Sequence, residues 1–157
     1  MGAGQLEDYQ RRFAPTFSLE ELIAFAATVP DGRPVGSWRP SRTPEEHGQH
    51  MRYLLEKIAI SQRVLVQRVS GAAAVHRIVA TGGGARSALW LQIKADVLGV
   101  SIATPASPER ACLGAAMVAS VAAGVHRDLG EASAAMVLPG QIYLPNPGNI
   151  KKYPQVS

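Results

Sequence analysis

The chain has 157 residues, of which 46% are hydrophobic and 18% charged, so it has the size and composition of one folded domain rather than of a disordered chain. Its net charge is +4, but no run of basic residues exceeds two and no basic helix carries interleaved aromatics, so we expect no nucleic-acid partner. We find neither a secretion signal nor an apolar stretch long enough to span a membrane, and therefore expect a cytoplasmic protein without a membrane partner.

Residues 1–42 are expected to form an irregular N-terminal segment with one short helix. Ser18 and Glu21 have the spacing of a capping box, and apolar residues follow at roughly helical intervals. Prolines and glycines recur from Pro30 to Pro40 and predict a loop. We expect this loop to lie at a surface or an interface because of its tryptophan and its basic residues, Arg33, Trp38, Arg39 and Arg42.

The main domain, expected over residues 43–157, begins with a stronger helix signal. Thr43 can cap the helix, Pro44 suits its first position, and Glu46 completes a capping box. An apolar stripe then runs to a helix end near Gly71, and it consists of Met51, Leu54, Leu55, Ile58, Leu65 and Val69. We expect the polar residues of this stretch to face elsewhere, among them Arg52, Glu56, Arg63 and Gln67.

The histidines and the single cysteine are expected to have structural roles. His47 and His50 have a spacing found in metal sites, but no convincing third ligand accompanies them, so we expect exposed residues in the first turns of the helix and no metal. His76 and His126 fall in predicted loops or helix ends. Cys112 is expected to be a small buried hydrophobic residue.

From residue 77 onwards, short β-prone runs alternate with helical patterns, which indicates an α/β architecture. The run Arg77–Thr81 has no charge after Arg77 and is typical of a buried strand in a parallel sheet. The other expected elements are a helix over 89–98 stopped by Gly99, a strand over 100–104, an Ala-rich helix over 107–124, a helix over 128–136, and a surface tail over 139–157.

The glycines between the first strand and the next helix form the best candidate ligand site. Glycine lets backbone N–H groups approach a phosphate without an obstructing Cβ, and the helix adds unpaired N–H groups and the positive end of its dipole. The candidate residues are Gly82, Gly83, Gly84, Ala85 and Ser87. Ser87 could cap the helix or donate to a ligand, and on the residues alone a tight structural turn is an equally good interpretation.

Two common nucleotide motifs do not fit these glycines. The spacing Gly82-x-Gly84-x-x-Ser87 is close to the dinucleotide fingerprint, but the next strand ends at Thr104-Pro105 without the acid that holds the ribose, so we do not expect NAD. The phosphate loop of P-loop NTPases requires a lysine directly after the glycines, and this sequence has none there.

Several further motifs, in order along the chain, resemble those of FGGY-family carbohydrate kinases. The segment Ile78–Ser87 resembles the adenosine motif of that family, and the spelling GGGARS is most similar to its xylulokinase-like members. The similarity covers about residues 50–153. It continues through Trp90, Gln92, residues 94–99, Pro105, residues 109–116, residues 122–124, and the closing Tyr143, Pro145, Pro147 and Tyr153.

The resemblance implies a ribonuclease H-like, actin-like ATPase fold, of which this chain would be the C-terminal lobe only. It also implies that Gly83, Gly84 and the region of Ser87 contact the adenosine and α-phosphate of ATP. The whole enzyme would use ATP and Mg²⁺ to phosphorylate a ketose or polyol such as xylulose. The remaining matches imply architectural roles, with Glu109 at a helix start, Gly114 at a close approach of two backbones, and Gln92, Ala95 and Asp96 as structural support.

The residues that perform the chemistry are expected outside this chain. The family's Asp-x-Gly-Thr phosphate loop, sugar pocket and catalytic aspartate precede the region of similarity, and none is present here. Phosphoryl transfer requires acceptor, phosphates and metal to be positioned together, so we expect no catalytic residue, no metal ligand and no activity in the isolated chain. The alternative is a non-catalytic interaction module derived from a kinase lobe, whose exposed apolar surface would favour a homodimer.

Overall fold

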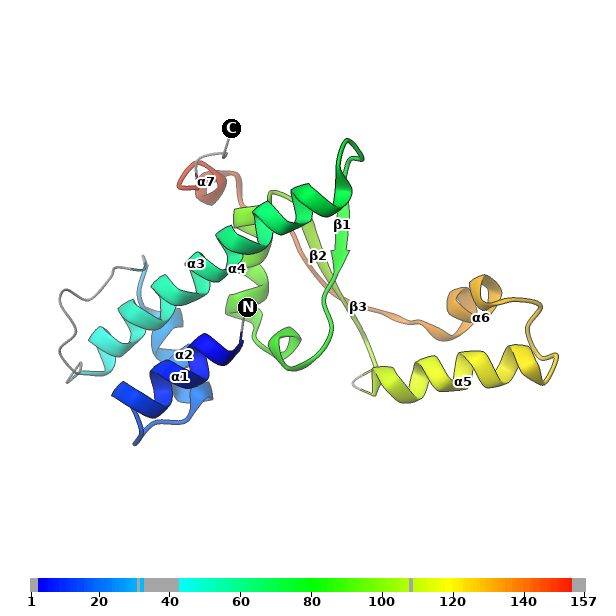
Figure 1. The fold of residues 1–157 in the computed structure, drawn as a ribbon, viewed down its shortest axis with the longest axis horizontal. Coiled ribbons are helices and arrows are strands. Elements are labelled where there is room, and N and C mark those ends of the chain that lie inside the picture. Colours follow the sequence, from blue (N-terminus) through cyan, green and yellow to red (C-terminus); the bar gives the residue numbers. More distant parts are fainter. Residues whose placement is uncertain (1–2, 31, 33–42, 108, 154–157) are drawn as a thin grey trace.

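The computed structural model describes residues 3–30, 32, 43–107 and 109–153, and its elements fall into three groups (Figure 1). The first group is helical and contains α1 (Ala3–Phe13), α2 (Leu19–Thr28) and α3 (Pro44–Ser70). The second contains β1 (Arg77–Val79), the 3-10 helix η1 (Gly83–Arg86), α4 (Ala88–Leu98), β2 (Ser101–Pro105), β3 (Pro139–Tyr143) and α7 (Pro147–Ile150). The third is the pair α5 (Arg110–Ala122) and α6 (Leu129–Met136).

The N-terminal segment contains two helices, so the expectation of one short helix within residues 1–42 is wrong. The capping box of α2 is confirmed, because Ser18 Oγ accepts from the amide of Glu21 while the Glu21 carboxylate accepts from the amide of Ser18. The sequence did not predict α1 because the helix is mostly polar and shows no clear apolar periodicity. Two of its side chains, Leu6 and Tyr9, are nevertheless buried. The predicted loop with Arg33, Trp38, Arg39 and Arg42 lies outside the described residues.

α3 begins and ends where the sequence predicts. Thr43 Oγ1 accepts from the amide of Glu46, whose carboxylate accepts in turn from the amide of Thr43. Gly71 follows the last turn with φ 56°, a left-handed value that only glycine adopts readily. The local signals at its two ends therefore suffice to place this helix.

The apolar stripe of α3 is covered only in its first half. Leu65 and Val69 are 60% and 82% exposed, whereas the earlier stripe residues Met51, Leu55 and Ile58 are buried. Arg63, which was expected to face away from the core, is buried as well. Its guanidinium donates to the carbonyl oxygens of Val97 and Tyr153 at 3.2 and 3.3 Å. These acceptors lie at the end of α4 and in the C-terminal tail, so only tertiary structure could reveal them.

His47 and His50 are not exposed, contrary to the prediction. His47 is 3% exposed, and its Nδ1 lies 3.0 Å from Tyr9 Oη. His50 is half-buried and stacks on the Tyr9 ring, with the ring centroids 4.5 Å apart. Both histidines are covered because α1, which the sequence did not predict, packs over this part of α3. Within the described ranges, no group of three side chains suited to a metal ion comes together.

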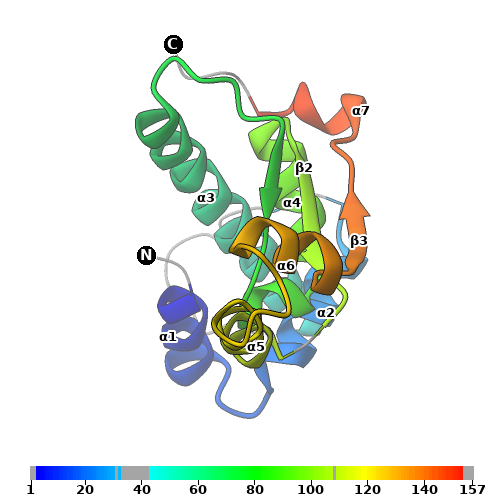
Figure 2. The same ribbon diagram turned by 90° about the vertical axis from the view of Figure 1, so that its right-hand side faces the viewer.

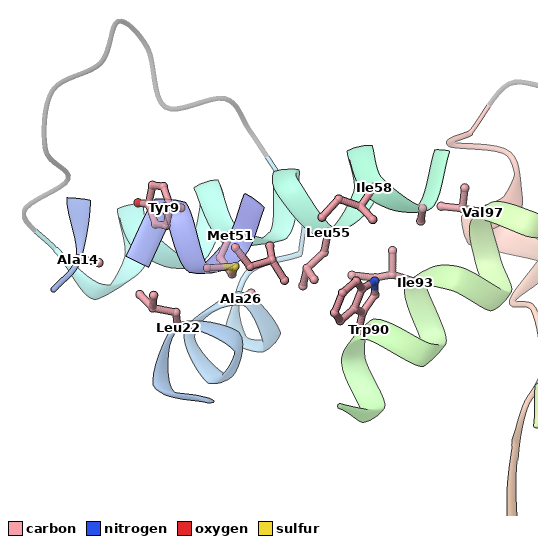
Figure 3. Packing of buried hydrophobic residues seen from close by; sticks show 12 residues of the cluster. Tyr9, Ala14, Leu22, Ala26, Met51, Leu55, Ile58, Trp90, Ile93 and Val97 are labelled. Atoms are coloured by element: carbon pink, nitrogen blue, oxygen red, sulfur yellow. The ribbon is translucent and has the colours of Figure 1, made fainter. Parts of the chain in front are cut away.

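α4 is buried on two sides and forms the centre of the fold (Figure 3). Trp90, Ile93 and Val97 belong to an apolar cluster with residues of α1, α2 and α3. Leu91 and Ala95 pack instead against the sheet. Because the first cluster contains residues from both sides of position 43, packing joins the two parts that the sequence separates, and the domain division at that point stays a prediction.

The three-stranded sheet has the order β1-β2-β3. β1 and β2 are parallel, as the alternation of strands and helices predicts, whereas β3 is antiparallel to β2 and replaces part of the expected surface tail. β3 was missed because it begins with Pro139 and Gly140, which favour a loop. The predicted burial of the first strand is also wrong, since Arg77, Val79 and Thr81 are exposed, and Ile78 and Ala80 pack against the core only as partly buried residues.

α5 and α6 pack against each other and stand apart from the other helices along the long axis of the molecule (Figure 1), and Figure 2 looks along that axis with the pair in front. Cys112 on α5 is exposed, so its expected burial is wrong. Nothing lies within 4 Å of a Cβ built on Gly114, so the expected close approach of two backbones does not occur among the described residues. No described helix combines the length and apolarity needed to cross a membrane.

The Asp96 carboxylate fastens the C-terminal tail to α4. Asp96 is 4% exposed and accepts hydrogen bonds of 2.8 Å from Gln92 Nε2, the amide of Asn146 and Asn149 Nδ2. These three N–H donors stabilise the buried carboxylate, and none of the three is a cation. The structural role expected for Gln92 and Asp96 is therefore confirmed.

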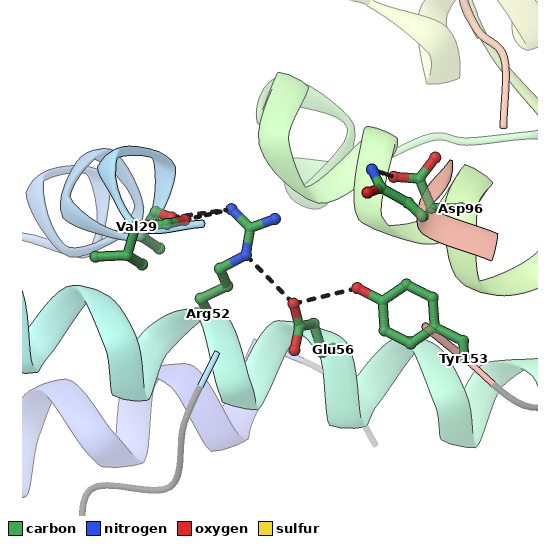
Figure 4. A network of polar contacts seen from close by, with 7 residues as sticks. Val29, Arg52, Glu56, Asp96 and Tyr153 are labelled. Carbon is green, nitrogen blue, oxygen red and sulfur yellow. Dashed lines mark hydrogen bonds and ion pairs between the residues drawn. The ribbon is translucent and has the colours of Figure 1, made fainter. Parts of the chain in front are cut away.

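A second polar chain connects the tail to α2 through α3 (Figure 4). Tyr153 Oη donates to Glu56, and Glu56 pairs with Arg52, with both distances 3.2 Å. Arg52 in turn donates to the carbonyl of Val29 at 2.8 Å. Burial and the neighbouring Glu56 carboxylate raise the pKa of the Tyr153 hydroxyl, so it stays protonated and remains a donor.

Replacing Asp96 with asparagine should destabilise the fold by about 2–3 kcal/mol, because the new amide nitrogen would face donors and leave buried groups unpaired. Urea unfolding of the whole chain measures this change. Glu109→Gln removes the same charge from an exposed residue without a side-chain capping bond and should change the free energy of unfolding by less than about 0.5 kcal/mol. Equal effects of the two substitutions would contradict the role given to Asp96.

Candidate functional site

The predicted glycine turn connects β1 to α4, and backbone geometry fixes it. Gly82 has φ 82° and ψ −170°, a combination essentially restricted to glycine. The amide of Ala85 then donates to the carbonyl of Gly82 at 3.1 Å. Ser87 Oγ accepts from the amide of Trp90 at 3.2 Å and so caps α4, which is one of the two roles that the sequence left open.

The glycines of the turn differ in their surroundings. A Cβ built on Gly82 or Gly83 would meet nothing within 4 Å, whereas one on Gly84 would lie 3.2 Å from the Trp90 ring. Gly84 therefore lets the turn lie directly on the indole. Gly83 has no comparable packing contact among the described residues and no left-handed backbone.

A cavity of about 610 Å³ lies between this turn and the helices α1 and α2. Gly83, Gly84 and Ser87 border it on the side of the turn. The facing wall is mostly apolar and is formed by Leu6, Leu19, Ile23, Ala24 and Ala27. The turn is thus open to a space whose volume falls in the range of small-molecule sites.

Charged side chains are few around this cavity and lie at its exposed edges. Glu7 and Glu20 come from the helical wall, and Arg86 comes from the turn. An apolar wall opposite exposed peptide groups suits a ligand with a flat, weakly polar part and an anionic part. The positive end of α4 and the Arg86 side chain favour the anionic part on the side of the turn.

Ala85 is separated from the other predicted site residues. It borders a smaller cavity of about 280 Å³ together with Thr81 and Lys94, on the side of α3. The Lys94 ammonium lies 4.3 Å from the centre of the Trp90 ring, and burial lowers its pKa. Trp90 borders the larger cavity, so its indole lies between the two spaces. Gly82 borders neither of them.

Sequence reasoning missed the helical wall of the larger cavity. The residues from α1 and α2 lie in the segment that was expected to be irregular. A signal was present in α2, which is apolar on two sides: Leu22 and Ala26 face the core, while Leu19 and Ile23 face the cavity. The mostly polar α1 carried no comparable signal.

Alanine substitutions in the turn should show which glycine is required by its backbone angles and which one tolerates a side chain. Gly82→Ala should cost about 1–3 kcal/mol of stability because a side chain is strained at this φ and ψ. Gly83→Ala should change stability by less than about 1 kcal/mol, since its Cβ meets nothing. Thermal and urea unfolding measure both variants, and a larger loss for Gly83→Ala would contradict the geometry of the turn.

Comparison with known proteins identifies the fold and the family. A family model for the "FGGY family of carbohydrate kinases, C-terminal domain" matches residues 7–123. The xylulose kinase of Bacillus subtilis strain 168 is 27% identical over 169 residues, which cover 94% of this chain and 34% of that relative. The family match begins within α1, so it includes a part of the chain that the sequence resemblance did not reach.

Two solved structures show the same arrangement. Ligand-bound xylulose kinase from Lactobacillus acidophilus matches with a TM-score of 0.77 at 20% identity, over 97% of this chain and 35% of that one. Xylulose kinase from Rhodospirillum rubrum matches with a TM-score of 0.71 at 29% identity, over 96% and 35%. The chain thus spans about a third of the length of these relatives. It belongs to the FGGY family of carbohydrate kinases and has the ribonuclease H-like, actin-like ATPase fold of their C-terminal lobe.

Proposed function

We propose that this chain is the ATP-binding part of a kinase that phosphorylates a ketose or polyol such as xylulose. Membership of the family supports the reaction class, and the names of the matching xylulose kinases support the substrate class. The observation that carries the ATP site is the opening of the Gly83–Gly84 backbone onto a cavity with an apolar opposite wall.

In this proposal the nucleoside occupies the cavity and the phosphates lie along the turn. The adenine and ribose pack against the apolar wall from α2, while the backbone of Gly83 and Gly84 and the start of α4 face the α-phosphate. Gly82 and Ala85 shape the turn, and Ser87 fixes the N-terminus of α4. Mg²⁺ would neutralise phosphate charge and would be held mainly by residues outside this chain.

We infer that the isolated chain binds adenine nucleotide weakly and does not phosphorylate sugar. Phosphoryl transfer requires the acceptor hydroxyl, the phosphates and a base to be held together, and one wall of a nucleotide cleft supplies only part of that positioning. The carboxylates that border the cavity, Glu7 and Glu20, lie at exposed edges of the helical wall and not beside the turn, where the phosphates are placed in this proposal.

A second candidate function is that of a non-catalytic interaction module. The observation that favours it is the exposure of large apolar side chains on and next to α5 and α6, namely Val118, Val125, Leu129 and Leu138. Exposed apolar side chains that lie together are typical of surfaces that bind another protein.

ATP binding should depend on the open space at Gly83. Isothermal titration of the whole chain should give weak ATP binding, and Gly83→Val should reduce the affinity at least about tenfold because its side chain enters the space reserved for the phosphate. Gly114→Val, on α5, where a Cβ likewise meets nothing within 4 Å, is the matched control and should leave affinity unchanged. Tight ATP binding together with phosphorylation of xylulose by this chain alone would refute the proposal that the isolated chain is inactive.

The interaction-module proposal makes a separate prediction for light scattering. If exposed α5 and α6 drive self-association, the wild-type chain should be larger than a monomer, and Val118→Glu should shift it towards the monomer by introducing charge into an apolar contact. Thr16→Glu places the same charge on an exposed loop residue and should leave the size unchanged. A monomer at all concentrations would exclude the homodimer.

A further inference from the structure

Two histidines of α3 and one tyrosine of α1 form a buried cluster that the proposed ATP site does not use. Tyr9 Oη lies 3.0 Å from His47 Nδ1, and the Tyr9 ring stacks on His50 at 4.5 Å and an interplanar angle of 20°. Phe13 and Phe17 enclose the cluster, with Phe17 edge-on to His47 at 5.3 Å. His47 is almost wholly removed from water and His50 partly so, and this loss of hydration makes the cluster a poor environment for added positive charge.

The cluster is a main attachment of α1 to the fold. α1 has 11 residues, and a helix of that length is marginal without packing. Its buried side chains in the apolar core are Leu6 and Tyr9, and the rest of the helix is largely polar. Loss of the contacts of Tyr9 therefore leaves Leu6 and the partly buried Phe13 as the apolar anchors of α1.

The same helix forms part of the candidate nucleotide cavity. Leu6 and Glu7 border it on the side facing the glycine turn. Since Leu6 and Tyr9 lie three residues apart on one face of α1, displacement of Tyr9 from α3 displaces Leu6 from the cavity wall. The histidine cluster and the cavity are thereby connected through one short helix.

We propose that Tyr9, His47 and His50 form an acid-sensitive clamp that holds α1 in place and so keeps the wall of the nucleotide cavity closed. The link to nucleotide rests on the function proposed above, whereas the clamp itself rests on the cluster. Protonation of either imidazole places a cation in a site shielded from water, and protonation of both places two cations three residues apart on one helix. The population of the released state, in which α1 leaves α3, then rises.

The pKa values of both histidines are shifted in the direction that an acid-sensitive clamp requires. Burial lowers the pKa of His47, although the Glu46 carboxylate opposes this, and burial together with His47 lowers the pKa of His50. The released state binds protons with the ordinary histidine pKa of about 6.5. The clamp is therefore complete above about pH 6.5 and weakens as the pH falls below that value.

The test uses the whole chain and measures two quantities separately, the attachment of α1 and the binding of adenosine in the cavity. Hydrogen exchange of residues 3–13, corrected for the intrinsic effect of pH, reports the clamp. Adenosine titration followed by Trp90 fluorescence in a Trp38→Phe background reports the cavity, and adenosine avoids the titration of a phosphate group. We expect α1 protection and adenosine affinity each to fall about threefold to tenfold between about pH 7.5 and pH 5.5.

Three variants make the result specific. His47→Gln and His50→Gln should each reduce the pH dependence, and the half-buried His50 provides the second measurement if His47→Gln does not fold. His76→Gln, at an exposed loop position, should behave as the wild type. Unchanged α1 protection across this pH range, or a pH dependence that survives both cluster substitutions, would overturn the clamp. Acid release of α1 without adenosine binding at any pH would support the clamp and refute the nucleotide site.

Discussion

The rest of the structure depends on the burial of α4 on two sides. Trp90, Ile93 and Val97 pack with α1, α2 and α3, while Leu91 and Ala95 pack with the sheet. An 11-residue helix buried in this way has no freedom to shift its start. The Ser87 cap and the Gly82 backbone then place the glycine turn at a fixed point between the sheet and the N-terminal helices.

The same helix organises the polar contacts that hold the C-terminal tail. Asp96 binds the tail directly, and Arg63 reaches across from α3 to the carbonyls of Val97 and Tyr153. These hydrogen bonds reach Asn146, Asn149 and Tyr153 of the tail from α3 and α4, so the tail is attached at several points. The tail is therefore packed as part of the folded domain.

The two ends of the molecule differ in how completely they are covered. Around α4 the N-terminal helices enclose a cavity beside the glycine turn, whereas the outer half of α3, one face of the sheet and the α5–α6 pair remain exposed. This contrast agrees with a chain that spans about a third of its kinase relatives.

The sequence by itself determined the capped helices α2, α3 and α4 and the position of the glycine turn. Caps at Ser18 and Thr43 and stops at Gly71 and Gly99 are short-range signals, because each depends on hydrogen bonds or backbone angles within one turn of helix. The glycines after the first strand located the candidate site for the same reason. The parallel pairing of the first two strands also followed from their alternation with helices.

Only the tertiary structure decided what covers these elements. The burial of His47 and Arg63, the strand β3 and the helical wall of the cavity all depend on partners distant in the sequence. Cys112 and Val79 show the converse, since apolar residues in strand and helix patterns stay exposed where no partner is present. Local patterns fix which face of an element is apolar, but burial depends on which long-range neighbours exist to meet that face.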